Sequence, residues 1–564
     1  MKKIIKNIAS LVIATLVFSG CEKDKFLLDG STTDGSITGP QVWDNNDYAR
    51  GVLNNAYFTV AEGFSLDGNG AMLASACDEA VNSNQGSSIN ILNNGTWSAV
   101  RTFDDVYNEM YAGIRKVNLF LENAQKSGIV PIDNLTKMED IERMRGEAFF
   151  LRAYFHFELL KRYGAIPLVT KVLATTDDLN LPRNTYDECV NQISLDCDSA
   201  IARLPEWTGD NGTKSPRLWW RSGSKGRATQ TAAMALKSRM LLYAASPLNN
   251  PGGDLTKWQK AADAAKRIID LNDHSLLTSY TNVFNYSAAA YNNEVIFATQ
   301  PSNRNDLEIN QAPISYNGGT GRTNPTQDLV DAFGMANGKA ILDPTSGYDP
   351  NNPYNARDPR LKFTINYNGL LFKGIPVETF VGGKDGLNNN ANATKTGYYM
   401  RKFLSESATW NVVSPTNQRR PWVVFRYAEV LLNYAEALNE AQGPVADVYK
   451  YLNAVRQRTG VALPALLASS GLTKDQMRAL IQNERRVELC FEGHRFFDVR
   501  RWKLGETLFN KPVNGMRITV NPNSTLNYTK FQVENRVFTA KNYLFPFSQS
   551  DLSRQPALVQ NTGW

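Results

Sequence analysis

The segment from Ile141 to Val169 is apolar around most of its circumference when it is drawn as a helix. One apolar stripe recurs at steps of three and four: Ile141, Met144, Ala148, Leu151, Phe155 and Leu159. A second lies beside it: Phe149, Ala153, Phe157 and Leu160. A helix of this kind must be packed on several sides, so the segment predicts the centre of a large helical core. We expect the helix to end near Gly164, because glycine tolerates the left-handed cap and Pro167 cannot continue a helix.

Two basic side chains, Arg152 and His156, lie one turn apart within this apolar helix. Buried cations need partners, so we expect carboxylates from another helix beside them. The segment from Ile481 to Trp502 supplies candidates at Glu484, Glu488 and Glu492, whose spacing would place them on one helix face. Several arginines interleave these carboxylates, and nearby cations compete with a bound metal. The pattern therefore favours a structural ion-pair network, which could include Arg152, over a metal site.

The rest of the chain predicts more helices, in pairs. Helical periodicity occurs over residues 47–60, 103–124, 184–204, 228–245, 258–271, 426–440 and 447–459. Helix pairs of about 34 residues are typical of tetratricopeptide repeats, although no clean tandem repeat runs along this chain. Residues 272–425 are rich in Asn, Gly, Tyr and Pro and predict irregular structure with short strands. We therefore predict one mostly α-helical domain, residues 41–564, made of tetratricopeptide-like helix pairs with long irregular loops and a few short strands.

The N-terminus reads as a secretory signal. Residues 1–20 combine a basic start with an apolar run that is too short to span a bilayer, and Ser19 and Gly20 directly precede Cys21. This pattern predicts lipidation of Cys21 and a polar tether over residues 21–40, so that acyl chains hold the protein on a membrane. A plain signal peptide with a chance cysteine is the alternative.

The composition of the chain argues against several classes of function. Loss of Lys2, Lys3 and Lys6 with the leader lowers the formal charge from +6 to +3, which is too small and too scattered to indicate nucleic-acid binding. The chain has only three histidines and no glycine-rich phosphate loop. For a glycosidase, which needs two carboxylates across a cleft, the acidic residues to consider are Asp78, Glu79 and Asp306. The four later cysteines show no paired spacing, and we assign them no chemistry.

Several segments in order resemble the SusD/RagB family of outer-membrane lipoproteins from Bacteroidota. The strongest are GEAFFLRAYFHFELLKRYGAIPLV (146–169), FRYAEVLLNYAEALNEA (425–441), YLNAVRQRTG (451–460) and ERRVELCFEGHRFFDVRRW (484–502). The resemblance implies a tetratricopeptide-like fold whose irregular loops form the ligand face. It also implies a non-enzymatic surface lipoprotein that captures oligosaccharide for a SusC-like, TonB-dependent transporter. The family's export signal after the cysteine is usually acidic, whereas residues 22–25 here are mixed in charge.

Sugar binding requires flat apolar rings beside hydrogen-bonding amides. Trp97, which follows Asn94 in the polar loop 77–98, fits that description best, and Asn82 lies in the same loop. The resemblance supports Trp97, because a loop tryptophan at this point often contributes to the family's ligand platform. Tyr316 is the second aromatic candidate. For both rings the alternative is packing beneath a loop.

We therefore expect a glycan-binding lipoprotein of the outer cell surface, with Trp97, Tyr316, Asn94 and Asn82 as ligand-binding residues. We expect no catalytic residue, cofactor, metal or nucleic-acid partner. Capture of peptides is the alternative within the family, and a surface glycoside hydrolase is the alternative from another class.

Overall fold

The computed structural model describes residues 42–43, 46–66, 70–124, 138–204, 226–284, 292–316, 318–387, 389–409 and 415–564. The predicted signal peptide, the predicted lipidation site Cys21 and the predicted tether lie outside the described residues. No helix in the described ranges is both long and apolar enough to cross a bilayer.

The described part of the chain is mostly helical, as the sequence predicts. Its helices are α3 (Asn46–Tyr57), α4 (Ser88–Asn93), α5 (Tyr107–Asn123), α6 (Met138–Tyr163), α7 (Tyr186–Ile201), α8 (Gln230–Ala245), α9 (Leu255–Leu271), α10 (Asp306–Gln311), α11 (Gln327–Ala332), α12 (Arg360–Thr364), α13 (Tyr427–Gln442), α14 (Ala446–Arg456), α15 (Lys474–Glu488), α16 (His494–Arg501), α17 (Gly505–Leu508) and α18 (Gln549–Arg554).

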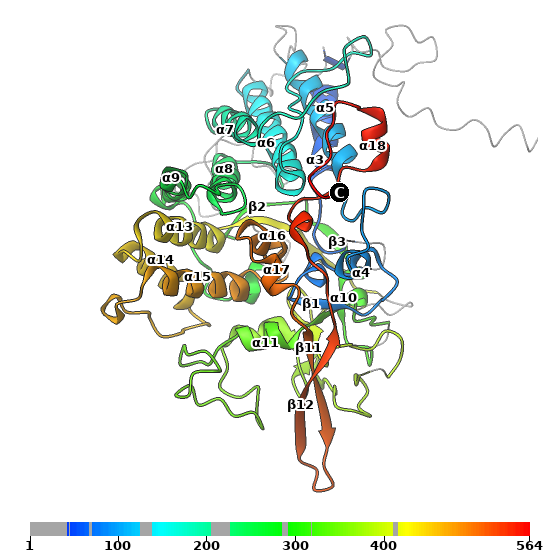
Figure 1. The fold of residues 1–564 in the computed structure, drawn as a ribbon, viewed down its shortest axis with the longest axis vertical. Helices are drawn as coiled ribbons and strands as arrows, with labels where there is room; N and C mark the ends of the chain where they lie inside the picture. Colours follow the sequence, from blue (N-terminus) through cyan, green and yellow to red (C-terminus); the bar gives the residue numbers. More distant parts are fainter. Residues whose placement is uncertain are drawn as a thin grey trace, which may run out of the picture.

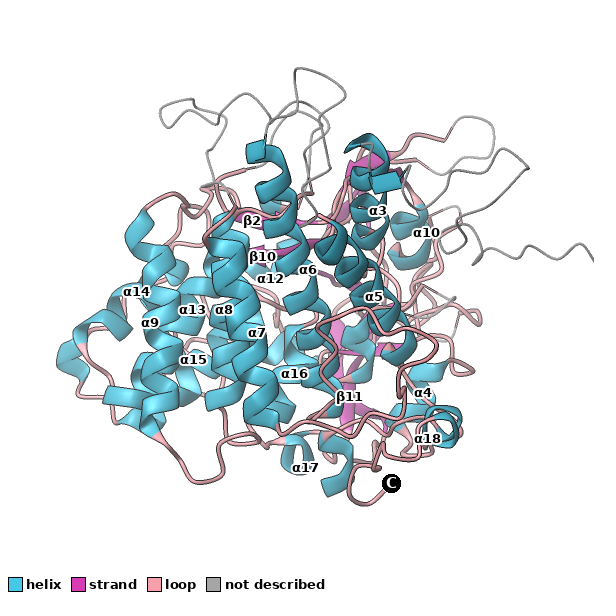
Figure 2. Ribbon diagram, turned by 90° about the horizontal axis from the view of Figure 1, so that it is seen from above, coloured by secondary structure: helices cyan, strands magenta, loops and turns pink. Residues whose placement is uncertain are grey.

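The longer helices stack side by side in one curved row. Helix α5 packs against α6, α6 against α7, α7 against α8, and α8 against α9. The row continues from α9 to α13, which follows in the chain only after the irregular segment, and α13 contacts α14 and α15. Figures 1 and 2 show this row from two directions. The stacking confirms the predicted tetratricopeptide-like architecture, in which each helix buries its apolar face on its neighbours.

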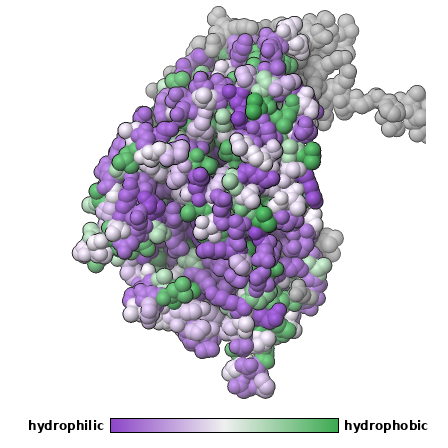
Figure 3. All heavy atoms as spheres, viewed as in Figure 1, coloured by the Kyte–Doolittle hydropathy of each residue, from purple (hydrophilic) through white to green (hydrophobic). Residues whose placement is uncertain are grey.

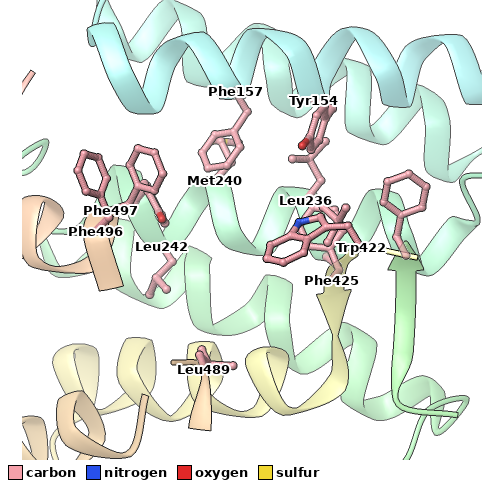
Figure 4. Close-up of a cluster of buried hydrophobic side chains, with 14 of the residues drawn as sticks. Tyr154, Phe157, Leu236, Met240, Leu242, Trp422, Phe425, Leu489, Phe496 and Phe497 are labelled. Atoms are coloured by element: carbon pink, nitrogen blue, oxygen red, sulfur yellow. The ribbon is translucent and has the colours of Figure 1, made fainter. Parts of the chain in front are cut away.

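Helix α6 lies in the core, as its two apolar stripes predict. It ends at Tyr163, where Gly164 takes a φ of +71° and donates its N–H to the carbonyl of Leu160. Figure 4 shows Tyr154 and Phe157 pointing from α6 toward Leu236 and Met240 of α8. The face of the molecule in Figure 3, by contrast, is mostly hydrophilic, with small scattered hydrophobic areas.

The expected partner of Arg152 is a carboxylate from another helix, and the structure confirms this. Its Nε and Nη2 donate to both oxygens of Asp196 on α7, at 2.8 and 2.6 Å. The partner does not come from the segment 481–502, because α7 rather than α15 is the neighbour of α6 on this side. No carboxylate is needed at His156: burial, with the nearby charge of Arg152, lowers its pKa to about 3, and the neutral ring contacts backbone groups.

The segment from Ile481 to Trp502 is not one helix. Helix α15 ends at Glu488, the chain turns at Phe491 (φ +64°) and Gly493 (φ +80°), and α16 begins at His494. The expectation that Glu492 shares a helix face with Glu484 and Glu488 is therefore wrong. The reason is the left-handed turn, which a glycine at position 493 tolerates.

The strands are short and form two-stranded sheets. They are β1 (Ala80–Asn82), β2 (Val295–Ala298), β3 (Ser302–Arg304), β4 (Thr323–Pro325), β5 (Ile365–Asn366), β6 (Leu371–Phe372), β7 (Ile375–Pro376), β8 (Tyr399–Met400), β9 (Gln418–Arg420), β10 (Val423–Arg426), β11 (Val513–Val520) and β12 (Leu526–Glu534). The antiparallel pairs are β1 with β4, β2 with β10, β3 with β9, β5 with β8, β6 with β7 and β11 with β12.

Most strands lie in the segment that the sequence marks as irregular, residues 272–425. Their pairing brings this segment back onto the helical row, since β2 pairs with β10 directly before α13. The hairpin β11–β12 projects from the body at the lower end of Figure 1. The region 77–98 is not a plain polar loop, because it contains strand β1 and helix α4.

Candidate functional site

Trp97 does not present a free ring to a ligand. Its side chain is only 2 % exposed, and its ring packs edge-on against Phe103, Phe545 and Trp564, with centroids 6.5, 5.3 and 4.5 Å away. The ring therefore fills an aromatic cluster that the C-terminal segment completes. In this structure the ring has the position that the packing alternative describes, because its faces are covered by core side chains.

Asn94 is exposed, but its side-chain oxygen already has partners. It accepts hydrogen bonds from the backbone N–H of Thr96 at 3.0 Å and from the Thr96 hydroxyl at 2.6 Å. Gly95 between them takes a φ of +74°, and a Cβ there would meet Val537. Asn94 therefore shapes the turn that leads into the buried Trp97 ring.

Tyr316 and Asn82 are both buried and hold backbone segments together. Tyr316 donates its hydroxyl to the carbonyl of Phe372 at 2.6 Å, and burial raises the pKa of the phenol to about 12. Asn82 accepts the N–H of Asn84 at 3.0 Å and donates to the Ser87 hydroxyl at 2.6 Å. Neither side chain is free to bind a sugar in this conformation. None of the four predicted residues lines the clefts described below.

The carboxylates considered as metal ligands belong to a buried ion cluster. Its members are five acidic groups, Glu294, Asp358, Glu484, Glu488 and Glu492, and five basic ones, Arg360, Lys402, Arg426, Arg456 and Arg458. Burial alone would raise the pKa of Glu488, but Arg458, Arg426 and Arg360 hold it well below its usual range. Each carboxylate is paired with an arginine or lysine, as the ion-pair interpretation predicts.

The acidic residues considered for glycoside hydrolysis do not face a common cleft among the described residues. Asp78 accepts from Arg495 Nη2 at 2.8 Å and from Arg486 at 3.1 Å. Glu79 is 1 % exposed, and burial together with the charge of Asp78 raises its pKa to about 8. Asp306 is bonded to Arg304. A raised pKa suits a general acid, but the Glu79 carboxyl is buried and accepts the backbone N–H of Phe491 rather than facing an open site.

A surface cleft of about 590 Å³ lies where the end of α3 meets the segment at residue 226 and the turn from β2 to β3. We call it the α3 cleft. Its volume is in the range usual for small-ligand sites. Its lining is Asn54, Tyr57, Phe58, Val60, Glu62, Gly226, Arg227, Phe297, Thr299, Gln300, Pro301 and Ser302.

Phe58 gives the α3 cleft its most unusual feature. The side chain is 83 % exposed, more than any other aromatic side chain in the described ranges. It directly follows the last residue of α3, where Thr59 and Val60 donate their N–H groups to helix carbonyls and end the helix. A large apolar ring held in water at the rim of a cleft is a candidate binding surface.

Amide and hydroxyl side chains line the same cleft. Asn54, Gln300 and Ser302 are exposed on the cleft wall. Gly226 brings two walls close together, because it takes a φ of +89° and a Cβ there would lie 2.9 Å from the backbone nitrogen of Gln300. Sequence reasoning missed this site. The one available signal was an aromatic residue, Phe58, near the end of the predicted helix 47–60.

Three other cavities fit a sugar chain less well than the α3 cleft does. One, of about 130 Å³, lies between α6, α8 and the turn at Gly493 and is too small for a sugar ring with its neighbours. Clefts of about 680 and 610 Å³ lie along the helical row, with several lysine and arginine side chains each and no aromatic ring exposed as Phe58 is.

Comparisons with known proteins agree with this architecture. A family model described as the SusD family matches residues 284–564, and one described as starch-binding and associating with the outer membrane matches residues 52–242. A curated relative, SusD-like protein P2 of Formosa agariphila, is 25% identical over 468 residues, which are 80% of this chain and 79% of the relative.

Solved structures match over nearly the whole chain. A SusD-like protein from Bacteroides fragilis is 28% identical with a TM-score of 0.77, over 93% of this chain and 98% of that one. A SusD-like carbohydrate binding protein from the same organism is 26% identical with a TM-score of 0.75, over 92% of this chain and all of that one.

Proposed function

Because the chain belongs to the SusD family, we propose that it is a cell-surface lipoprotein that captures glycan chains in the α3 cleft and passes them to a TonB-dependent transporter. Carbohydrate binding and association with the outer membrane are properties of the family. The observation that supports the α3 cleft as the site is the exposed ring of Phe58 in a cleft that the exposed amide of Gln300 also lines.

The chemistry of the cleft suits a sugar better than an apolar ligand. The C–H face of a pyranose can cover the Phe58 ring and remove apolar surface from water. The amide of Gln300 offers both a donor and acceptors to sugar hydroxyls. Binding of this kind leaves every covalent bond of the ligand intact, so release to a transporter needs no chemical step.

Replacing Phe58 by alanine should weaken glycan binding by about 1–3 kcal/mol, which is roughly fivefold to more than a hundredfold in Kd. The ring is largely in water already, so the melting temperature should hardly change. Isothermal titration with a panel of oligosaccharides measures the first quantity, and thermal unfolding of the same preparation measures the second.

The matched control is Leu342→Ala, which removes another highly exposed apolar side chain outside the cleft. This variant should bind glycan normally. Equal affinities for the wild type and both variants would rule out the α3 cleft as the site. Chromatography of the sugar after incubation separates binding from hydrolysis, and a parallel titration with peptides tests the alternative ligand class.

Lipidation at Cys21 is a separate proposal that rests on Ser19-Gly20-Cys21. Cys21→Ala should abolish incorporation of labelled palmitate and move the protein from the membrane fraction to the soluble fraction. Cys77→Ala, at a buried cysteine within the domain, is the control and should leave labelling unchanged. A Cys21→Ala protein that still carries label would contradict the proposal.

A further inference from the structure

The α3 cleft contains charged groups, and their pairing limits which ligands can enter. Arg304, which bonds the lining residue Glu62, already has a carboxylate partner on each of its three nitrogens. Its Nε and Nη2 donate to the two oxygens of Asp306 at 2.7 and 2.6 Å, and its Nη1 donates to Glu62. The hydrogen bond from Arg304 lowers the pKa of Asp306, so this pair stays ionised at neutral pH. Bidentate pairing of this kind leaves Arg304 little capacity for a second anion.

Arg227, which lines the cleft, is also paired within the protein. Its Nη1 donates to Glu147 at 2.5 Å, and its Nη2 donates to the side-chain oxygen of Asn54. The guanidinium lies 5.4 Å from the centre of the Tyr57 ring. Glu147 is buried and accepts in addition from Arg143 at 2.6 Å and from the Tyr57 hydroxyl at 2.8 Å. Moving Arg227 toward a ligand would therefore break a paired contact with a buried carboxylate.

The charged residues that line the cleft are Glu62 and Arg227, one of each sign, and each is paired within the protein: Glu62 with Arg304, and Arg227 with Glu147. Glu62 itself lines the cleft, with about a third of its side chain exposed. An anionic ligand would give up water and meet this carboxylate, and no described residue that lines the cleft offers it an unpaired cation.

Resting on the function proposed above, we propose that the α3 cleft selects neutral glycans and rejects uronate-containing or sulfated chains. A neutral sugar loses only hydroxyl hydration, which the amide of Gln300, the hydroxyl of Ser302 and the ring of Phe58 can replace. The cleft would be selective because an anionic sugar loses hydration that no cation replaces. It need not make more contacts with a neutral sugar than with an anionic one.

The test is calorimetric titration with two sets of oligosaccharides of equal length, one neutral and one containing uronate. The wild type should bind at least one neutral oligosaccharide, with a Kd that hardly changes between low and high salt. It should bind the uronate chains at least about tenfold more weakly. Glu62→Lys places a cation on the cleft wall and should reduce the preference for neutral chains by about fivefold or more, an effect that salt weakens.

The control is Glu506→Lys, which makes the same change in net charge at an exposed position of α17 outside the cleft. It should leave the preference for neutral chains unchanged. Tighter binding of uronate chains by the wild type, abolished by Phe58→Ala, would overturn the selectivity while leaving the proposed function intact. If neither set binds, and if further neutral oligosaccharides of other linkages also do not bind, both the proposed function and the selectivity are overturned.

Discussion

Replacing Arg426 by methionine should lower the free energy of unfolding by about 3–5 kcal/mol. The guanidinium is 1 % exposed, and it donates to Glu492 at 2.6 and 2.7 Å, to Glu488 at 2.8 Å and to Glu294 at 2.9 Å. Its removal leaves the buried cluster with four cations and five carboxylates, so one negative charge is uncompensated in the interior. Urea unfolding of wild type and variant at neutral pH measures the loss.

The matched control is Arg478→Met, which removes an arginine that also bonds a carboxylate twice. Arg478 donates to both oxygens of Glu440 at 2.6 Å, but about a third of its side chain is in water. Water screens the charge left behind, so we expect a loss of less than about 1 kcal/mol. Similar losses in the two variants would mean that burial of the cluster does not determine its contribution to stability.

Replacing Glu79 by glutamine should make the protein more stable at neutral and alkaline pH. Burial, with the nearby charge of Asp78, raises the pKa of Glu79 to about 8, whereas an unfolded chain loses this proton near pH 4.5. Between those values the folded state binds one more proton than the unfolded state, so stability falls as pH rises. Glutamine does not titrate, and its oxygen can still accept the N–H of Phe491. The gain should grow from near zero at pH 4.5 to about 3 kcal/mol at pH 7.

Asp78→Asn is the control with the opposite sign. Although burial raises the pKa of Asp78, Arg486 and Arg495 lower it below the usual range, so the ionised form stabilises the folded state above the unfolded pKa. Stability from Asp78 is lost as pH falls, and the asparagine variant should be less stable at neutral pH. Urea unfolding at pH 4.5, 6 and 7.5 distinguishes the two variants. A gain for Glu79→Gln that does not vary with pH would show that the carboxyl is not protonated in the folded protein.

Several local features could be read directly from the sequence. The two apolar stripes of 141–169 place α6 in the core, and Thr185 caps α7 in a box with Glu188, whose backbone N–H it accepts at 3.2 Å. These features depend on side chains three or four residues apart. In a helix such side chains lie on the same face, so their spacing in the sequence is enough to show that they are neighbours in the structure.

The ends of elements were harder to predict where a turn interrupts a good helical pattern. The segment 481–502 keeps its apolar and charged spacing through Glu492, yet the helix ends at Glu488. The turn is stabilised by contacts from elsewhere in the chain, since the N–H of Phe491 bonds Glu79 and the ammonium of Lys402 bonds the carbonyls at 488 and 490.

Only the tertiary structure decided which loop aromatic is buried and which is exposed. Trp97 lies in the segment 77–98, which the sequence predicts as a polar loop, and Phe58 lies in the segment 47–60, which it predicts as a helix. Trp97 is buried because Phe545 and Trp564, more than 400 residues later, close over it, while no described segment covers Phe58. The sequence by itself indicated most of the longer helices, through apolar residues that recur every three or four positions. The burial of a side chain in a loop depends on partners that are distant in the chain, and local spacing carries no information about them.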